Sequence, residues 1–281
     1  MSLEFAVIAA GAMGAAVGCR LAGNGGRVLT LLDGRSASTR RRAEEAGMTG
    51  VDDERIAGSD IILSIVPPAE AVALAERLAP ALAHSSRKPV FVDCNAVDVE
   101  TVRRIAGTIQ PSGARFADGA IIGPPPKPGE VGPTFYVSGV PAQDLEVLRV
   151  YGLVVRRIDG PVGAASALKM SYAGITKGLT AIAATMVLAA TRAGAAAALR
   201  EELAGSQPQL LQRFAKALPD MFPKAYRWAG EMREIAAFAG QDPAGRRMYE
   251  AFAETYDALA ADARGSRTEI ERIERFFSSP D

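Results

Sequence analysis

Lys169 lies in a helix-like segment made largely of small residues. Residues 165–174 are mostly Ala, Ser and Gly, which favour close packing. A partly buried lysine is costly unless it is paired or its pKa is lowered, and a lowered pKa suits a general acid or base. At helical spacing Tyr172, Thr176 and Thr180 share its face. This polar stripe predicts one wall of a cleft, with Tyr172 as a second proton-relay group. The alternative is a lysine that extends to solvent over a buried stem.

A glycine turn follows the first apolar run. Residues 5–10 are strand-like, residues 12–23 are helix-like, and Gly11 and Gly14 lie at the junction. They match the second and third glycines of the dinucleotide fingerprint G-x-G-x-x-G, whose first glycine is here Ala9. Such a turn lets the backbone approach a pyrophosphate that the helix N-terminus then holds. The alternative is a purely structural turn. The predicted cofactor contacts of the turn are Gly11, Ala12, Met13 and Gly14.

The end of the second strand bears on which dinucleotide binds. Asp33 follows the fingerprint at the distance of the carboxylate that bonds ribose hydroxyls and favours NAD. Arg35, Ser36 and Arg40 would instead accept the 2′-phosphate of NADP. The sequence is compatible with NAD and with NADP, and it slightly favours NADP. Arg42, like Arg41, is expected on a solvated helix face.

Asn95 follows the strand-like residues 89–93, at the sheet edge where ligands bind in open α/β folds. It is a candidate to bond the cofactor carboxamide or a substrate hydroxyl. The alternative is a helix N-cap for the segment starting near Val97. The remaining predicted cofactor contacts are Val66 and Pro67.

Four further residues are candidates for substrate binding. Backbone N–H groups near Ile122 and Gly123 could hold a carboxylate, the alternative being a stiff turn toward Pro128. Lys177 and Arg233 could each pair with an anionic substrate, the alternative being a surface charge.

Composition limits the other chemistry. The chain has 281 residues, 32 Lys and Arg against 32 Asp and Glu, one His and two Cys. The zero formal net charge gives no overall attraction to nucleic acid or to an anionic membrane. One His and two Cys argue against a Ser-His-Asp triad, a metal site and a disulfide framework. Nothing near Cys94 indicates an activated thiolate. We therefore expect no metal, and proton chemistry by Lys, Tyr, Asp or Glu.

The first half of the chain alternates apolar runs with amphipathic segments. The strand-like runs are residues 5–10, 27–33, 60–66, 89–93, 115–122, 134–139 and 153–159, and the helix-like segments are 12–23, 36–46, 69–83, 98–109 and 141–152. This alternation predicts a parallel sheet covered on both faces, which is a doubly wound, Rossmann-type α/β domain.

The character changes after residue 160, where the chain becomes alanine-rich and helical. A long helix from about 162 to 193 opens this part. We predict an NAD(P)-binding Rossmann domain over residues 1–160, followed by an all-α substrate and dimerisation domain over 161–281. The alanine-rich helices would bury surface against a second copy, giving a homodimer.

Two apolar runs bear on localisation. Residues 5–19 follow Glu4 rather than a positive charge, and fifteen residues are too few to span a bilayer. Residues 179–190 are fewer still. We expect a soluble, cytoplasmic protein.

Several segments resemble, in order, the motifs of one known family. They are residues 10–14 (G-L-G-x-M-G turn), 92–96 (D-x-S-T), 118–123 (D-A-P-V-S-G substrate loop), 163–172 (the G-x-x-x-x-x-K helix, with Lys169 as its lysine) and, weakly, 233–235 (K-D-L). The family is that of the β-hydroxyacid dehydrogenases, which includes 6-phosphogluconate dehydrogenase and 3-hydroxyisobutyrate dehydrogenase. The resemblance implies hydride transfer between a nicotinamide and a small hydroxy acid, with Lys169 as the general acid/base. The helical tail resembles a little-studied bacterial branch.

The chain departs from these motifs at substrate-facing positions. Ile122 replaces a serine, Pro124 a glycine, Ala173 an asparagine and Asn95 a serine. The sequence therefore identifies neither the substrate nor whether the reaction includes a decarboxylation.

Three other functions remain. Imine reduction on the same fold is one, although imine-reducing relatives tend to replace this lysine. A cofactor-binding sensor or partner protein without turnover is another, and the altered substrate loop keeps it open. The third is a Rossmann-like domain that binds a different nucleotide.

Overall fold

The chain forms two compact units in the computed structural model, Met1–Lys169 and Met170–Asp281. The structure describes residues 3–127, 129–139 and 143–278. The division falls inside a helix that starts at Ala164, whereas the sequence predicts a domain boundary at residue 160.

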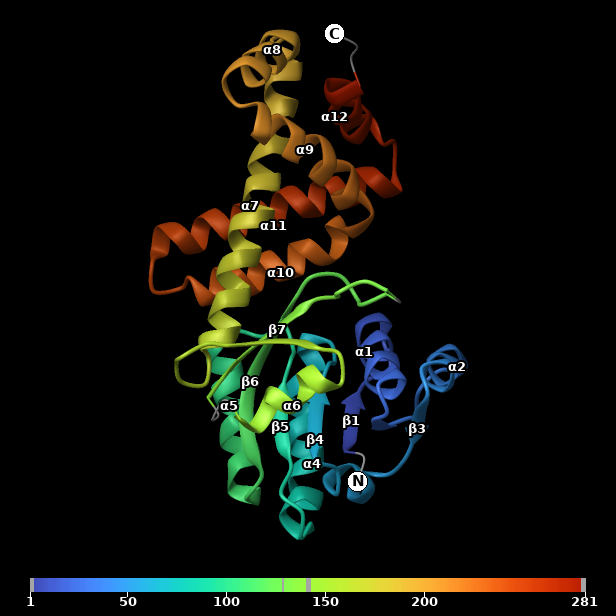
Figure 1. Ribbon diagram of the computed structural model, residues 1–281. Helices are drawn as coiled ribbons and strands as arrows, with labels where there is room; N and C mark the ends of the chain where they lie inside the picture. The colour runs from blue at the N-terminus through green and yellow to red at the C-terminus, as the bar shows by residue number, and fades with distance from the viewer. Residues whose placement is uncertain (1–2, 128, 140–142, 279–281) are drawn as a thin grey trace. The chain divides into compact units, whose positions relative to one another are not determined.

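An eight-stranded sheet organises the first unit (Figure 1). Its strands are β1 (Glu4–Ile8), β2 (Arg27–Thr30), β3 (Met48–Gly50), β4 (Ile61–Ser64), β5 (Val90–Asp93), β6 (Arg115–Ile122), β7 (Thr134–Ser138) and β8 (Val154–Arg157), in the spatial order β3-β2-β1-β4-β5-β6-β7-β8. The helices are α1 (Ala12–Gly23), α2 (Ala37–Glu45), α3 (Asp53–Ala57), α4 (Ala71–His84), α5 (Val99–Ile109) and α6 (Gln143–Val150), with 3-10 turns η1 (Pro68–Glu70) and η2 (Gln110–Ser112). The predicted doubly wound α/β domain is confirmed.

One strand pairing differs from the expected parallel sheet, because β7 runs antiparallel to β6. A parallel pair needs a crossover of about a dozen or more residues, usually helical. The described residues between β6 and β7 contain no helix, so the chain turns back instead. The short elements β3 and α3 were not predicted, and part of the predicted helix 141–152 lies outside the described residues.

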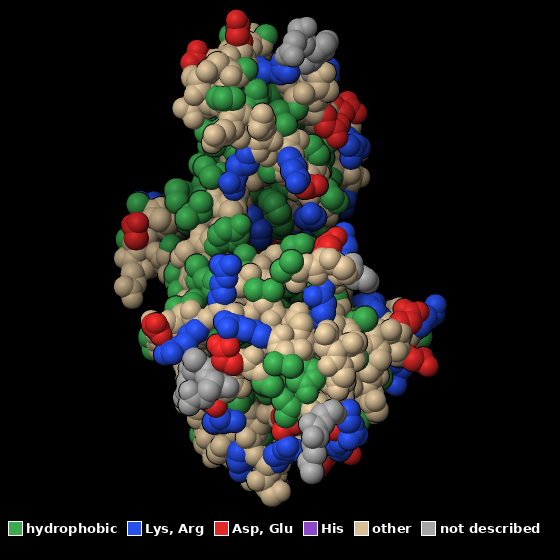
Figure 2. All heavy atoms as spheres, viewed as in Figure 1, with side chains coloured by type: hydrophobic (Ala, Val, Ile, Leu, Met, Phe, Trp, Pro, Cys, Tyr) green, Lys and Arg blue, Asp and Glu red, His purple; other side chains and the backbone are tan. Residues whose placement is uncertain are grey.

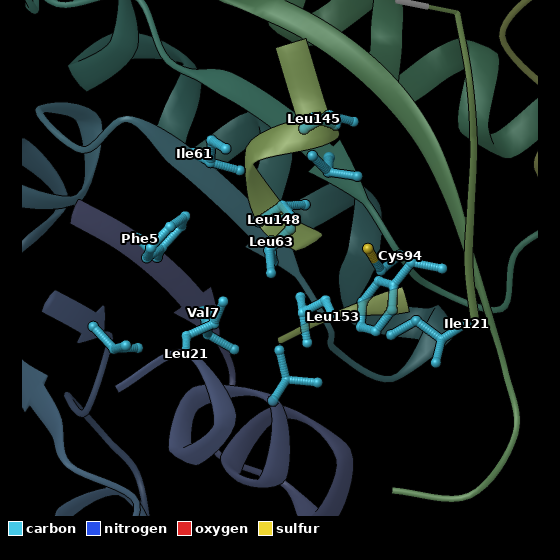
Figure 3. Close-up of a cluster of buried hydrophobic side chains, with 14 of the residues drawn as sticks. Phe5, Val7, Leu21, Ile61, Leu63, Cys94, Ile121, Leu145, Leu148 and Leu153 are labelled. Atoms are coloured by element: carbon cyan, nitrogen blue, oxygen red, sulfur yellow. The ribbon is translucent and has the colours of Figure 1, made fainter. Parts of the chain in front are cut away.

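Both faces of the sheet are buried, as the near-continuous apolar strands require. Alternate residues of β1 point to opposite sides. Phe5 and Val7 pack in a cluster with α1 and α6, whereas Ala6 and Ile8 pack with α4 and α5. Figure 3 shows the first cluster, including Leu21 of α1, Leu63 of β4 and Leu148 of α6.

The second unit is helical throughout its described residues. It contains most of α7 (Ala164–Arg192), then α8 (Ala196–Ser206), α9 (Pro208–Met221), the 3-10 turn η3 (Phe222–Lys224), α10 (Ala225–Phe238), α11 (Pro243–Arg264) and α12 (Thr268–Ser278). The long opening helix and its close packing are confirmed. A Cβ at Gly174 would lie 2.8 Å from Tyr249 Oη, and one at Gly178 would lie 3.2 Å from Phe252 Cε2 of α11.

Helix α7 is also the one helix of the described chain that is long and apolar enough to cross a membrane, with a mean hydropathy of 1.5 in its most apolar window. The uninterrupted apolar run within it, residues 179–190, is too short to indicate this. Within the structure 44% of that window is buried, which also fits the core helix of a soluble protein.

Candidate active site

The glycine turn between β1 and α1 uses its two glycines differently. A Cβ at Gly14 would collide with the main-chain oxygen of Ala9, so packing of helix on strand demands this glycine. A Cβ at Gly11 would meet no protein atom within 4 Å, so protein packing does not demand that one. The open space at Gly11 is the room that a pyrophosphate needs at a helix N-terminus. Ala9 is tolerated in place of the first glycine because its φ is not positive. Among the described residues Arg267 is the only non-glycine with a positive φ.

Arg42 also reaches this turn. Its Nη1 donates to the main-chain oxygen of Ala10 at 3.2 Å. The expected solvated face is therefore wrong for Arg42. The contact joins residues that are 32 positions apart, so no local sequence pattern predicts it.

The end of β2 presents the residues that would distinguish NAD from NADP. Asp33 is exposed. Ser36 Oγ caps α2 by accepting from the Thr39 N–H at 3.3 Å. Arg35 pairs with Glu70 of η1 at 3.1 Å, a partner that the sequence did not suggest.

Asn95 is buried at the carboxyl edge of the sheet, just after β5. Its Oδ1 accepts from the Val66 N–H at 2.7 Å. Its Nδ2 donates to Ser64 Oγ and to Asp93 Oδ2, both at 2.8 Å. The N-cap alternative is wrong, because Asp98 caps α5 through the Thr101 N–H at 2.9 Å. The Asn95 side chain thus ties the ends of β4 and β5 together and places Val66, the residue before Pro67.

Lys169 lies next to this network. Its Nζ is 3.5 Å from the main-chain oxygen of Asn95. Burial lowers the Lys169 pKa, while the carboxylates of Asp93 and Asp118 act in the opposite direction. Lys169 is thus partly buried with a lowered pKa, as the small-residue segment around it predicts.

Two other titratable groups surround the lysine. Burial raises the pKa of Asp93 to about 6, with the charge of Asp118 contributing. Burial also raises the pKa of the Cys94 thiol, which keeps it protonated. Cys94 points into the apolar cluster with Ile121 (Figure 3), and the expectation that it is not an activated thiolate is confirmed.

The substrate-loop candidates lie at the end of β6. Ile122 is its last residue, and Gly123 has a φ of +128°. A Cβ at Gly123 would lie 3.0 Å from the Cα of Pro133, so the turn itself requires glycine. Pro128 lies outside the described residues. Arg20, which no sequence pattern indicates, ties this loop to α1: its Nη2 donates to the main-chain oxygens of Lys127 and Glu130 at 2.9 and 2.8 Å.

The remaining candidates belong to the second unit. Tyr172 is 52% exposed. Lys177 forms an ion pair with Glu231 and lies 5.0 Å from the centre of the Trp228 ring. Arg233 pairs with Asp257 and lines an open groove of about 580 Å³ with Arg246, Glu250 and Glu254.

Comparison with known proteins agrees with this fold. Residues 4–150 match the NAD binding domain of 6-phosphogluconate dehydrogenase, and residues 190–259 match a domain of unknown function, DUF1932. The chain therefore belongs to the family of the 6-phosphogluconate dehydrogenase NAD-binding domain. The predicted family resemblance is confirmed.

Individual relatives extend this picture. An uncharacterized 28.5 kDa protein of Methanothermus fervidus is 32% identical over 157 residues, 55% of this chain and 58% of that protein. A conserved protein of unknown function, described as structurally similar to 3-hydroxyacid dehydrogenases, has 28% identity and a TM-score of 0.75, covering 93% of this chain and 98% of that one. The 3-hydroxyisobutyrate dehydrogenase of Mycobacterium tuberculosis shares the fold at 17% identity, with a TM-score of 0.74 over 95% of this chain and all (100%) of that one. Together with the family, these likenesses support an NAD(P)-dependent oxidoreductase.

Proposed function

We propose that this protein transfers a hydride between a nicotinamide cofactor and a small hydroxy acid or a related alcohol, with Lys169 as the general acid/base. One observation carries the proposal. Lys169 Nζ lies 3.5 Å from the Asn95 main chain at the carboxyl edge of the sheet, in surroundings that lower its pKa. Ligands of open α/β sheets bind at this edge.

Different residues of the first unit would bind the cofactor and transfer the proton. The N-terminus of α1, with Gly11 leaving it open, would hold the pyrophosphate. The bound cofactor supplies or accepts the hydride. Burial lowers the Lys169 pKa and so enlarges the fraction of neutral amine, which can take the substrate hydroxyl proton during oxidation and return it during reduction.

The test combines cofactor binding with turnover. Fluorescence titration with NADPH and NADH should show saturation, and a screen of hydroxy acids should find turnover that Lys169→Ala lowers at least 100-fold, as expected for a general acid/base. The matched control is Lys127→Ala, which removes a lysine that is 71% exposed. Turnover by Lys169→Ala within tenfold of wild type contradicts the mechanism.

For the cofactor we propose NADPH. Arg35, Ser36 and the N-terminus of α2 would together bind the 2′-phosphate, which supports this proposal. The Arg35–Glu70 pair has to open for this. Arg35→Ala should weaken NADPH at least tenfold and leave NADH within twofold, and equal loss of both cofactors would contradict the assignment.

Two rival functions are tested by the same screen. Reduction of imines in preference to any hydroxy acid or ketone would favour imine reductase chemistry, against which Lys169 argues. Saturable cofactor binding without any turnover would favour a sensor or partner protein, for which Ile122, Pro124 and Ala173 are the supporting departures.

We also propose a cytoplasmic homodimer that forms through α7. Tyr172, Ile175, Ile182 and Met186 are 46–62% exposed and fall on one side of this helix at its period of about 3.6 residues per turn. Exposed hydrophobic side chains lie among charges of both signs on the face drawn in Figure 2. We propose that a second copy, rather than a membrane, covers the α7 face. The partial burial of this helix in protein supports this, because 44% of its most apolar window is already buried.

A further inference from the structure

The N-terminus of α7 is capped by a carboxylate from the sheet. Asp118, in the middle of β6, is fully buried. Its Oδ2 accepts from the main-chain N–H groups of Gly163 and Ala165 at 2.9 Å and of Ser166 at 3.0 Å. The Ser138 hydroxyl donates to the same oxygen at 3.2 Å, and the Ser166 hydroxyl donates to Oδ1 at 2.7 Å.

The local sequence cannot provide this cap. Gly163 precedes the helix with a φ of +105°, and a Cβ there would lie 2.8 Å from Val99 Cγ1. A side chain at the usual capping position is therefore excluded both by backbone conformation and by space. Asp118 replaces it from 45 residues away and brings a negative charge to the positive end of the helix.

The same helix turn sets the position of Lys169. The lysine follows Ala165 by one turn, and helical side chains lean toward the helix N-terminus. Its Nζ accordingly lies against the end of β5, 3.5 Å from the Asn95 oxygen. The charge of Asp118 also acts directly on the ammonium, whose pKa it raises against the effect of burial.

We propose that Asp118 is the positioning residue for Lys169: it fixes the first turn of α7 to β6 and thereby places Nζ at the carboxyl edge of the sheet. The catalytic consequence rests on the proposed function of Lys169, whereas the positioning itself does not. Misplacement of a reacting group by about 1 Å can cost about 100-fold in rate.

Lysine acetylation tests the positioning without any substrate. Wild type and Asp118→Asn are treated briefly with the N-hydroxysuccinimide ester of acetic acid, and mass spectrometry compares labelling of Lys169 with that of exposed Lys127 in the same sample. Loss of the cap frees Nζ, and loss of the anion increases its neutral fraction, so relative labelling of Lys169 should rise at least fivefold. Amide hydrogen exchange at residues 163–166 should become at least tenfold faster.

The matched control is Glu4→Gln. Glu4 is a buried carboxylate of the same sheet whose ion-pair partners among the described residues are Arg55, through both terminal nitrogens at 2.5 Å, and Arg27. Labelling of Lys169 should stay within twofold of wild type in this variant. If Asp118→Asn does not fold, Ser166→Ala removes only the donor to Oδ1 and should still raise the labelling, at least twofold.

The outcomes separate the two proposals. Unchanged labelling in Asp118→Asn, or an equal rise in Glu4→Gln, overturns the positioning role. Once a substrate is available, kcat of Asp118→Asn should fall at least tenfold with KM and cofactor affinity within twofold of wild type, and a loss confined to KM would also overturn it. Full turnover by Lys169→Ala would instead refute the proposed function and leave the labelling result standing.

Discussion

Substituting each of the two turn glycines by alanine should have different effects: Gly14→Ala should lower stability, and Gly11→Ala should lower cofactor affinity. A Cβ at Gly14 collides with a main-chain oxygen, which cannot move aside as a flexible side chain would. Overpacking of a buried site costs about 1–3 kcal/mol, and a backbone collision belongs at the upper end of that range. Gly14→Ala should therefore lower the free energy of unfolding by about 3 kcal/mol.

Gly11→Ala should leave stability nearly unchanged. Its φ of −69° and ψ of −174° are accessible to alanine, and the new methyl group meets no protein atom within 4 Å. The weaker N-cap preference of alanine costs at most about 1 kcal/mol. The methyl group would, however, occupy the room left for the pyrophosphate, so cofactor affinity should fall at least tenfold, which is about 1.4 kcal/mol.

Two assays distinguish these effects. Urea unfolding followed by circular dichroism measures stability, and fluorescence titration with NADPH and NADH measures affinity. The reasoning is refuted if Gly14→Ala keeps wild-type stability within 1 kcal/mol, or if Gly11→Ala binds both cofactors as tightly as wild type. The second result would make the turn purely structural.

Three further predictions concern pH, a loop and assembly. The pKa of Asp93 is about 6 in the folded protein against an ordinary 3.8, so the folded state binds more protons between these values and this contribution to stability, about 3 kcal/mol, is lost as pH rises through 6. Urea unfolding from pH 4 to 7 should show this loss in wild type relative to Asp93→Asn, and parallel pH curves would contradict it. Arg20→Ala should release the loop at Lys127 and Glu130, lower stability by about 1 kcal/mol and speed its proteolysis, whereas cleavage at the wild-type rate would show that Arg20 does not hold the loop. Ile182→Glu should halve the molar mass measured by light scattering, and a wild type that is already monomeric, or that sediments with lipid vesicles, would refute the dimer.

Most of the fold could be predicted because burial on both faces of the sheet leaves a strong local signal. Each central strand reads as a short apolar run between amphipathic helices. The elements β3 and α3 could not be predicted because Met48–Gly50 and Asp53–Ala57 are too short to show a period. The antiparallel direction of β7 did have a signal, since no helix-like segment separates residues 122 and 134 to form a crossover.

The candidate site was predictable only where chemistry and local pattern coincide. Gly11, Gly14 and Lys169 stand out because their residue types are unusual for their surroundings. The tertiary partners around them do not stand out, because Asp118 binds Ser166, Arg42 binds Ala10 and Glu70 binds Arg35 over 32 to 48 positions of chain. Asn95 lies between these cases: its location at the sheet edge was predicted, but its use of all its amide groups within the sheet depends on tertiary contacts.

The contact of Arg42 with Ala10 has an electrostatic consequence. Many arginines of this chain, such as Arg55, are neutralised by a carboxylate. Arg42 binds a carbonyl oxygen instead, and no carboxylate within ion-pair distance of it occurs in the described residues. A carbonyl offers a dipole but no compensating charge, so the guanidinium keeps its full positive charge next to the glycine turn. A protein of zero formal net charge can thus present a local positive potential, screened over about 8 Å at physiological ionic strength, where an anionic dinucleotide would arrive.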